Sequence, residues 1–280
     1  MLALLILLGC TDPNPTDGEW SVVWEDDFEG SAGEAPNPDY WAYDVGGDGW
    51  GNSQLEYDTD RTDNASLDGS GNLRIVALEE EYEGNAYTSA RLNTLGLFEH
   101  GYGRYEARIK LPAGGKGIWP AFWLLGNNFP EVGWPWCGEV DIMEFRGSEP
   151  ETVTGTLHGP GYSGALGIGS ETTLDEGDFT EDFHDFAVEI DPGHIAWTVD
   201  GEQVQRISRA DLPENATWVF DMIELENDED GFFIILNLAV GGHYDGDPDE
   251  TTEFPAEMLV DWVRVSERGY TRAVDEDDDW

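Results

Sequence analysis

The chain has 280 residues and a formal net charge of −47, because 60 aspartate and glutamate residues outnumber 13 lysine and arginine residues. This charge argues against nucleic acids and anionic membranes as partners, and less strongly against heavily sulfated polysaccharides. Self-repulsion of this size should destabilise the compact state at low salt, whereas about 1 M salt would largely screen it. We therefore expect a halophilic protein.

The first ten residues, MLALLILLGC, form an apolar run that is too short to span a bilayer. The run resembles the apolar part of an export signal, and its last four residues, Leu7-Leu8-Gly9-Cys10, resemble a lipobox. We expect export, with a lipid on Cys10 tethering the chain to the cell surface or outer membrane. The alternative is a secreted protein with a chance cysteine. Residues 11–18 are a polar linker, and Cys137 is then a free, buried thiol.

Most of the chain is typical of β-structure, because short apolar runs alternate with turns rich in Gly, Pro, Asn and Asp. We expect one all-β domain over residues 19–268, followed by a solvated acidic tail over residues 269–280. In chain order, the predicted strands cover residues 20–28, 73–78, 87–92, 102–111, 117–126, 139–144, 153–158, 183–191, 232–240 and 258–265, and residues 195–204 are predicted to form a hairpin. An acidic hairpin is expected over residues 79–86, a hairpin tip at Asp200-Gly201, and a short helix or acidic loop over residues 221–230.

Aromatic residues that suit sugar binding occur in two places. The glycine-rich loop over residues 46–57 carries Trp50, Asn52, Gln54, Glu56 and Tyr57. This mixture suits the hydroxyl groups and apolar faces of sugars better than an ordinary turn-rich hairpin does. In the strand over residues 117–126, Trp119 and Trp123 share one face, either in the core or as a platform for pyranose rings.

Three single polar residues stand out in or beside the later strands. His158, at a strand end, either has a structural role or hydrogen-bonds a carboxylate or a sugar. Asn237 interrupts an apolar strand and needs partners, which could be substrate hydroxyls if it points into a cleft. Asp261 also lies inside an apolar strand, where a cation, Arg264 or another donor would satisfy it.

The stretch Glu139-Val140-Asp141-Ile142-Met143-Glu144 places three acids among apolar residues. Because strand side chains alternate, Glu139 and Asp141 share a face and Glu144 does not. A β-bulge around Ile142-Met143 would add one residue and return Glu144 to the acidic face. Carboxylates held together repel each other, so one should keep a proton at neutral pH. Glycoside hydrolysis requires this pairing of carboxylate and carboxylic acid; the alternative, a solvated edge strand, has no need of the surrounding Trp and Gly residues.

Seven segments together resemble glycoside hydrolase family 16, and within it the bacterial laminarinase-like endo-β-1,3-glucanases. They are GWGNSQLEY, GIWPAFWLLG, GWPWCGEVDIMEFRG, TLHGPGYSG, FHDFAVEIDPGHIAWTVDG, ILNLAVGG and FPAEMLVDWVRV, in this order. The resemblance extends from about residue 20 to residue 266. It implies an all-β fold, a β-jelly roll sandwich of two curved antiparallel sheets with a glycan-binding cleft on the concave one.

The resemblance also implies a role for each acid. Glu139 would be the nucleophile, Glu144 the general acid/base that holds the proton, and Asp141 the residue that keeps the proton balance between them. Such a mechanism retains configuration and needs carboxyl groups about 5–5.5 Å apart. The residues that the resemblance places in sugar subsites are Asn52, Arg91, Trp119, Trp123, Trp134, His158 and Asn237.

No cofactor is expected for catalysis, but the resemblance implies a structural calcium ion away from the cleft. Its ligands would be the Asp261 side chain and the backbone carbonyls of Asp27 and Gly71, because calcium prefers oxygen. The chain departs from the family over residues 56–58, 79–86 and 221–230, and in its acidity, which leaves the preferred glycan open.

We expect an exported, monomeric, retaining endo-glycosidase that hydrolyses laminarin-type β-1,3-glucan or mixed-linkage β-1,3/1,4-glucan. A galactanase acting on agar or carrageenan is an alternative, although those substrates call for basic residues that this chain has few of. A transglycosylase is another, because it shares the covalent intermediate. A non-catalytic glucan-binding protein is the third, although such proteins usually lack one of the two glutamates.

Overall fold

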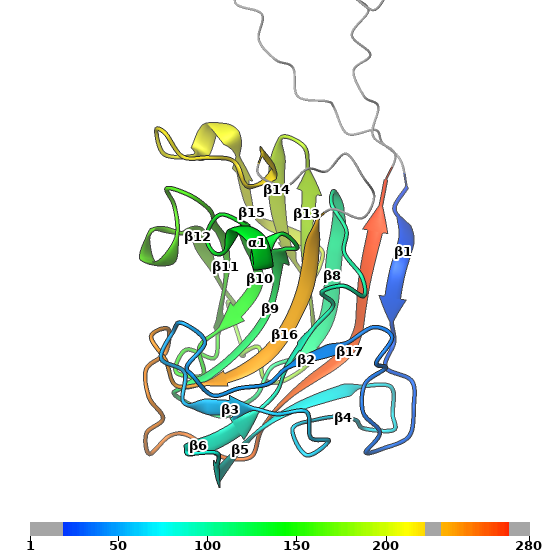
Figure 1. The fold of residues 1–280 in the computed structure, drawn as a ribbon, viewed down its shortest axis with the longest axis vertical. Helices are drawn as coiled ribbons and strands as arrows, with labels where there is room; N and C mark the ends of the chain where they lie inside the picture. Colours follow the sequence, from blue (N-terminus) through cyan, green and yellow to red (C-terminus); the bar gives the residue numbers. More distant parts are fainter. Residues whose placement is uncertain (1–18, 222–230, 269–280) are drawn as a thin grey trace, which may run out of the picture.

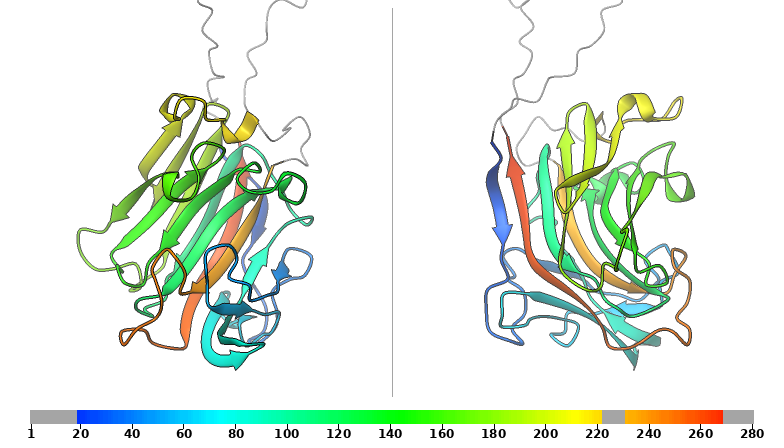
Figure 2. Two further views of the ribbon diagram at one scale, coloured as in Figure 1. Left: turned by 60° about the vertical axis from the view of Figure 1, so that its left-hand side comes forward. Right: turned by 180° about the vertical axis from the view of Figure 1, so that it is seen from behind.

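The structure is a computed structural model that describes residues 19–221 and 231–268, which form two stacked, curved β-sheets (Figure 1, Figure 2). Within these residues the larger sheet has ten strands. Eight of them follow one another in the order β15 (Glu202–Ser208), β14 (His194–Val199), β13 (His184–Asp191), β8 (Gly103–Lys110), β17 (Ala256–Glu267), β5 (Leu73–Tyr82), β6 (Asn85–Ser89) and β3 (Glu56–Asp58). The other two are β1 (Ser21–Asp26), which pairs with β17, and β4 (Ala65–Leu67), which pairs with β5. The smaller sheet has seven: β12 (Ile168–Thr173), β11 (Thr152–His158), β10 (Glu139–Phe145), β9 (Ile118–Gly126), β16 (Phe232–Val240), β7 (Arg91–Asn93) and β2 (Ala42–Asp44). The part of the chain that the structure describes also holds four short helices: α1 (Phe129–Val132), η1 (Gly164–Leu166), η2 (Arg209–Asp211) and η3 (Val219–Asp221).

The predicted all-β sandwich is confirmed, with one correction to its strand directions. Among the described strands every pairing is antiparallel except that of β3 with β6, which is parallel. A parallel pair needs a long connection, and residues 59–84 provide it here. Both predicted hairpin tips are confirmed, because Glu83-Gly84 and Asp200-Gly201 have the positive φ angles that two-residue hairpin turns require. The helix or loop expected over residues 221–230 lies, apart from Asp221 in η3, outside the described residues.

The core lies between the two sheets and follows from strand alternation. In β8 every second residue is buried, among them Tyr105, Ala107 and Ile109, which face the smaller sheet. Across the core, Val140, Met143 and Phe145 of β10 are fully buried. The sequence pattern therefore decides which face of β8 and β10 packs inward, and leaves the other face of each sheet free for polar side chains.

Strand β10 contains the β-bulge expected at Ile142-Met143. Its pairing with β9 shifts between Asp141 and Met143, and its pairing with β11 shifts between Asp141 and Glu144. The larger sheet supports this irregular backbone: Trp197 of β14 donates its indole N–H across the core to the carbonyl oxygen of Asp141, at 2.8 Å. A side chain at position 155 would prevent this contact, because a Cβ on Gly155 would lie 2.6 Å from the Trp197 ring.

The two ends of the described chain lie together. Strands β1 and β17 are paired, with Ser21 opposite Glu267, so residues 19 and 268 lie near each other at one end of the sandwich (Figure 1). None of the helices in the described residues is long or apolar enough to cross a membrane.

Replacing Trp197 with Phe keeps an aromatic ring in the core but removes the hydrogen bond to the bulge. We expect the free energy of unfolding to fall by about 1–3 kcal/mol, because a buried carbonyl loses its partner. Urea denaturation of W197F measures this change. Trp136 is 58% exposed, so W136F is the matched control, with an expected change within about 0.5 kcal/mol. Equal stability of W197F and W136F would show that the hydrogen bond does not support the bulge.

Candidate active site

The three acids of β10 lie on the face of the smaller sheet that is turned away from the core. Their cross-strand partners are Leu125, Trp123 and Ala121 on β9, and His158, Thr156 and Thr154 on β11. Each set is spaced by two residues, and residues two apart on a strand point the same way. The bulge thus turns Glu144 to the side of Glu139 and Asp141, as predicted.

Each of the three acids has a polar neighbour close to its carboxyl group. The indole N–H of Trp119 donates to Oε1 of Glu144 at 3.1 Å, and the indole of Trp134 hydrogen-bonds Glu139. The Nε2 atom of His158 lies 3.2 Å from Oδ2 of Asp141 and 3.8 Å from Oε1 of Glu139. These contacts connect the acids to β9, β11 and the loop before β10, so the site is assembled from three parts of the chain.

Burial raises the pKa of all three carboxyl groups. The pKa of Glu139 rises to about 8, first through burial and then through the charge of Asp141, while His158 and Trp134 oppose the rise. Burial also raises the pKa of Asp141 to about 8. The pKa of Glu144 rises well above its usual value, because it is buried and lies near the charges of both other acids. The cluster therefore keeps protons at neutral pH, and Glu144 is the acid best placed to hold one.

A second row of side chains crosses the same face of the sheet. Glu144 pairs with Ala121, Ala121 with Asn237 of β16, and Asn237 with Arg91 of β7, so these positions form one continuous ladder. Oδ1 of Asn237 accepts the indole N–H of Trp123 at 2.8 Å. Substrate hydroxyls were the partners considered for Asn237, but Trp123 already satisfies its side-chain oxygen.

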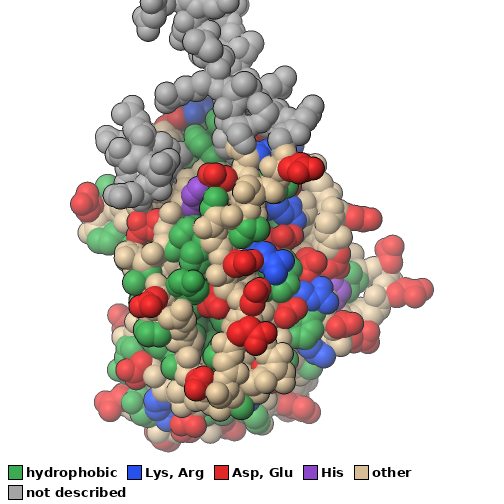
Figure 3. Space-filling view, turned by 90° about the vertical axis from the view of Figure 1, so that its right-hand side faces the viewer, with side chains coloured by type: hydrophobic (Ala, Val, Ile, Leu, Met, Phe, Trp, Pro, Cys, Tyr) green, Lys and Arg blue, Asp and Glu red, His purple; other side chains and the backbone are tan. Residues whose placement is uncertain are grey.

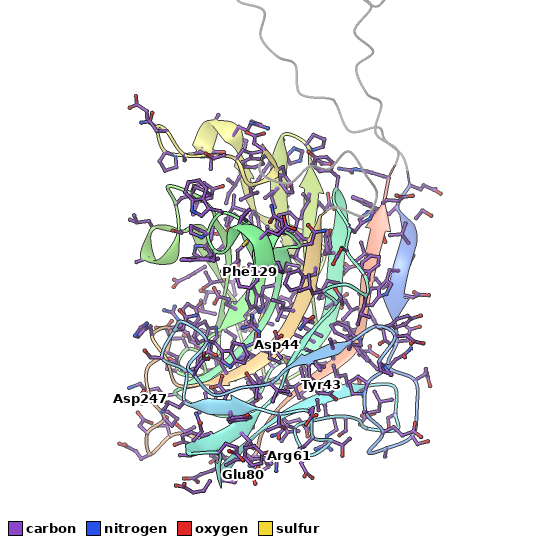
Figure 4. All side chains as sticks on the ribbon, in the orientation of Figure 1. Tyr43, Asp44, Arg61, Glu80, Phe129 and Asp247 are labelled. Atoms are coloured by element: carbon purple, nitrogen blue, oxygen red, sulfur yellow. The ribbon has the colours of Figure 1, made fainter. Side chains whose placement is uncertain are left out.

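Arg91 lies between two aromatic rings at the end of this row. Its guanidinium carbon is 4.8 Å from the Trp123 ring and 4.9 Å from the Trp50 ring. Its Nε atom donates to Oδ2 of Asp44 at 3.0 Å, and Figure 4 labels Asp44 on β2. Sequence reasoning missed Asp44, because nothing in its local pattern links it to Arg91, 47 residues later.

Trp119 and Trp123 differ in what surrounds them. Trp119 is only 8% exposed and packs against Tyr244, with ring centroids 5.0 Å apart. The guanidinium carbon of Arg146 lies over the Tyr244 ring, 5.2 Å from its centroid. Trp119 therefore positions Glu144, and Trp123 is the more open of the two expected platforms. Sequence reasoning also missed Tyr244, which follows the Gly241-Gly242 pair and is brought to Trp119 only by the fold.

The remaining predicted sugar-binding residues lie around this centre. Trp134 is 44% exposed and its ring centroid is 6.2 Å from that of His158. Asn52 is exposed, and its backbone carbonyl accepts the N–H of His243 at 2.9 Å, which places its loop beside Trp119. Glu56, from the same loop, is buried and accepts the N–H of Val240, so it is not available to a sugar.

Two of the three expected calcium ligands lie near strand ends, Asp27 just after β1 and Gly71 just before β5, whereas Asp261 lies inside β17. A Cβ on Gly71 would lie 3.9 Å from the carbonyl oxygen of Asp27. Asp261 lies at a register shift in β17, next to the residue that pairs with Leu73, and its carboxylate is 3.3 Å from Nε of Arg108. In this structure Arg108, rather than Arg264, lies beside the Asp261 carboxylate.

Comparison with known proteins places the chain in a family. The family described as Glycosyl hydrolases family 16 matches residues 50–227. The chain belongs to this family. It is a glycoside hydrolase, and the predicted β-jelly roll is the fold of its relatives.

Three similar proteins show how far the likeness extends. A β-glucanase of Rhodothermus marinus is 40% identical over 274 residues, which cover 94% of this chain and 92% of that protein. The catalytic domain of an endo-1,3-β-glucanase (laminarinase) from Thermotoga petrophila RKU-1 is 46% identical, with a TM-score of 0.80, covering 90% of this chain and 99% of that chain. The endo-β-1,3-glucanase of Pyrococcus furiosus is 45% identical, with a TM-score of 0.81, covering 93% and 99%.

Replacing Tyr244 with Leu should change the pH profile of this family 16 hydrolase. The Trp119 hydrogen bond favours the ionised form of Glu144, so loosening it raises the pKa of Glu144 further. Glu144 is the expected general acid, and a general acid works while it is protonated. The basic limb of kcat/KM should therefore move to higher pH while kcat falls roughly ten- to hundredfold.

Kinetics across the pH range measure both effects. Y244F, which keeps the ring against Trp119, is the matched control and should keep the wild-type basic limb. If Y244L lowers activity without moving that limb, Tyr244 only supports the fold.

Proposed function

We propose that this glycoside hydrolase is a retaining endo-β-1,3-glucanase that acts on laminarin-type glucan. The observation that carries the proposal is the bulge in β10, which turns Glu139 and Glu144 to the same side of the sheet. The similarity to endo-1,3-β-glucanases of Thermotoga petrophila and Pyrococcus furiosus, at 46% and 45% identity, supports the substrate class.

In the proposed mechanism, the carboxylate of Glu139 attacks the anomeric carbon of the sugar. Glu144 gives its proton to the glycosidic oxygen as the bond from that oxygen to the anomeric carbon breaks. Glu144 then takes a proton from water, and the water oxygen displaces Glu139 from the same carbon. Two inversions give net retention. Asp141, between the two glutamates, would share a proton with them as their charges change.

The side chains around the acids suit a neutral glucan chain. Trp123 and the exposed ring of Trp134 offer apolar faces to pyranose rings, while Asn52 and His158 offer polar contacts. A sulfated galactan fits this site less well than a neutral glucan. A sulfated chain would need basic side chains that are free to bind its sulfate groups, and Arg91 already pairs with Asp44. Both glutamates are present, which argues against a non-catalytic glucan-binding protein. Transglycosylation and cleavage of mixed-linkage β-1,3/1,4-glucan remain alternatives that share this site.

E139Q and E144Q should each lower laminarin hydrolysis by at least about 10²–10⁴-fold while the fold is kept. Reducing-sugar release and circular dichroism measure the two properties. E131Q is the matched control, because Glu131 is an exposed acid on α1. Full activity of either glutamine variant would remove the assigned roles.

The two roles can also be told apart. With an activated aryl glycoside and azide, E139A should give the α-glycosyl azide, and E144A the β-glycosyl azide, because azide replaces the nucleophile in one and water in the other.

Proton NMR of early wild-type products should show the β-anomer. Comparison of laminarin, lichenan, agarose and carrageenan as substrates would identify the glycan.

We also propose that the protein requires salt for full stability. Figure 3 shows acidic side chains scattered over one face of the molecule, with fewer basic ones between them. The melting temperature should rise by several degrees between about 0.1 and 1 M NaCl, because the screening length falls from roughly 10 to 3 Å. Differential scanning calorimetry measures this. A melting temperature that stays constant over the series would contradict the proposal.

A structural calcium ion is a further proposal, with the Asp261 carboxylate and the carbonyls of Asp27 and Gly71 as its ligands. Calcium would have to compete with Arg108 for Asp261. EGTA should lower the melting temperature by a few degrees, and D261N should abolish this response, because binding to the native state alone stabilises it. D39N, at an exposed acid, should respond like the wild type. No effect of EGTA on the wild type would remove the site.

Export and lipidation at Cys10 remain proposals from the sequence, since residues 1–18 lie outside the described residues. The monomeric state and the boundaries at residues 19 and 268 are likewise predictions. Cys137 is buried and free, as expected.

A further inference from the structure

Two acids of β10 and the imidazole of His158 form a cluster with the spacing of metal ligands. Among the described residues, Glu139, Asp141 and His158 are the one set of three such side chains whose donor atoms all lie within 4.8 Å of one another. The Nε2 atom of His158 is 3.2 Å from Oδ2 of Asp141 and 3.8 Å from Oε1 of Glu139.

These two separations lie close to those between two ligand atoms of one metal ion. A tetrahedral zinc ion with bonds of 2.0–2.2 Å holds its ligand atoms about 3.3–3.6 Å apart. Asp141 is only 4% exposed, yet its Oδ2 atom accepts no hydrogen bond, although the imidazole is 3.2 Å away. The buried oxygen and the imidazole nitrogen are therefore close but poorly aligned with each other, as two ligands of one central ion would be.

We propose that Glu139, Asp141 and His158 bind a zinc ion that reversibly blocks this active site. One imidazole and two carboxylates suit zinc better than magnesium or calcium, which prefer oxygen ligands only. Two carboxylates held together in a buried site also gain more from a divalent cation than exposed acids do.

The surroundings make this an inhibitory site rather than a resident cofactor site. Ligating histidines in tight zinc sites donate their other ring N–H to a carboxylate or carbonyl, and losing that partner costs about 10–100-fold in affinity. The Nδ1 atom of His158 is buried without a hydrogen-bond partner. Zinc should therefore bind reversibly and be removed by EDTA.

Zinc binding and catalysis exclude each other in this arrangement. The inhibition rests on the proposed function, because Glu139 cannot attack a sugar while it is a zinc ligand. Zinc should raise the apparent KM for laminarin and leave kcat unchanged. The binding itself is independent of the reaction, so it can be measured without substrate.

Isothermal titration calorimetry with ZnCl2 and the full chain tests the site. A buffer with about 1 M NaCl screens weak zinc binding by the many surface acids. The wild type should bind one equivalent, and H158Q should bind at least tenfold more weakly. H184Q is the matched control: the Nδ1 atom of His184 is 2.8 Å from Oδ2 of Asp200, so it is also a histidine beside an acid. It should bind zinc as the wild type does, and MgCl2 should not replace zinc.

A spectroscopic measurement keeps the test decisive if H158Q does not fold. Cobalt(II) added to the wild type should give the strong visible bands of a four-coordinate site, and a laminarin oligosaccharide should remove them. E139Q should weaken these bands. If H158Q binds zinc as tightly as the wild type, the proposed site is wrong. It is also wrong if the wild type shows neither saturable zinc binding nor the visible cobalt bands. Laminarin hydrolysis without zinc binding would refute this inference alone, whereas zinc binding without hydrolysis would refute the proposed function alone.

Discussion

The active site depends on one extra residue in β10. Without the bulge at Ile142-Met143, strand alternation would turn Glu144 into the core and Met143 out of it. An irregular backbone leaves a carbonyl that needs a partner, and Trp197 supplies it from the opposite sheet. The sandwich is therefore needed for more than burial of apolar surface, because its second layer holds the bulge in place.

Once the acids share a face, their mutual repulsion and burial determine what the site can do. Carboxylates that cannot all ionise keep protons at neutral pH, which a general acid requires. Trp119 hydrogen-bonds Glu144, Trp134 hydrogen-bonds Glu139, and His158 lies beside Asp141, so the three acids are not equivalent. The same excess of negative charge beside an imidazole is what makes the cluster attractive to a divalent cation.

Outside the site, the scarcity of basic residues shapes the surface. Several arginines each contact two acids: Arg104, Arg108, Arg146 and Arg264. The planar guanidinium group can serve two carboxylates at once, which suits a chain with only two lysines. The 60 acids outnumber the 13 bases so far that pairing two acids with each base would still leave most acids without a basic partner, and solvent and ions must then offset their repulsion.

Local periodicity in the sequence is enough to predict the strands and the direction in which their side chains point. Alternation identified most strands, and the odd spacing of Glu144 from Asp141 predicted the bulge. The contacts of Trp197 with Asp141, Tyr244 with Trp119, Asp44 with Arg91 and Arg108 with Asp261 were decided only by the tertiary structure. Each joins residues that are far apart in the chain, and their proximity depends on strand order and register, which no local pattern encodes. The sequence thus determined which residues face the same way, and the tertiary structure determined which of them meet.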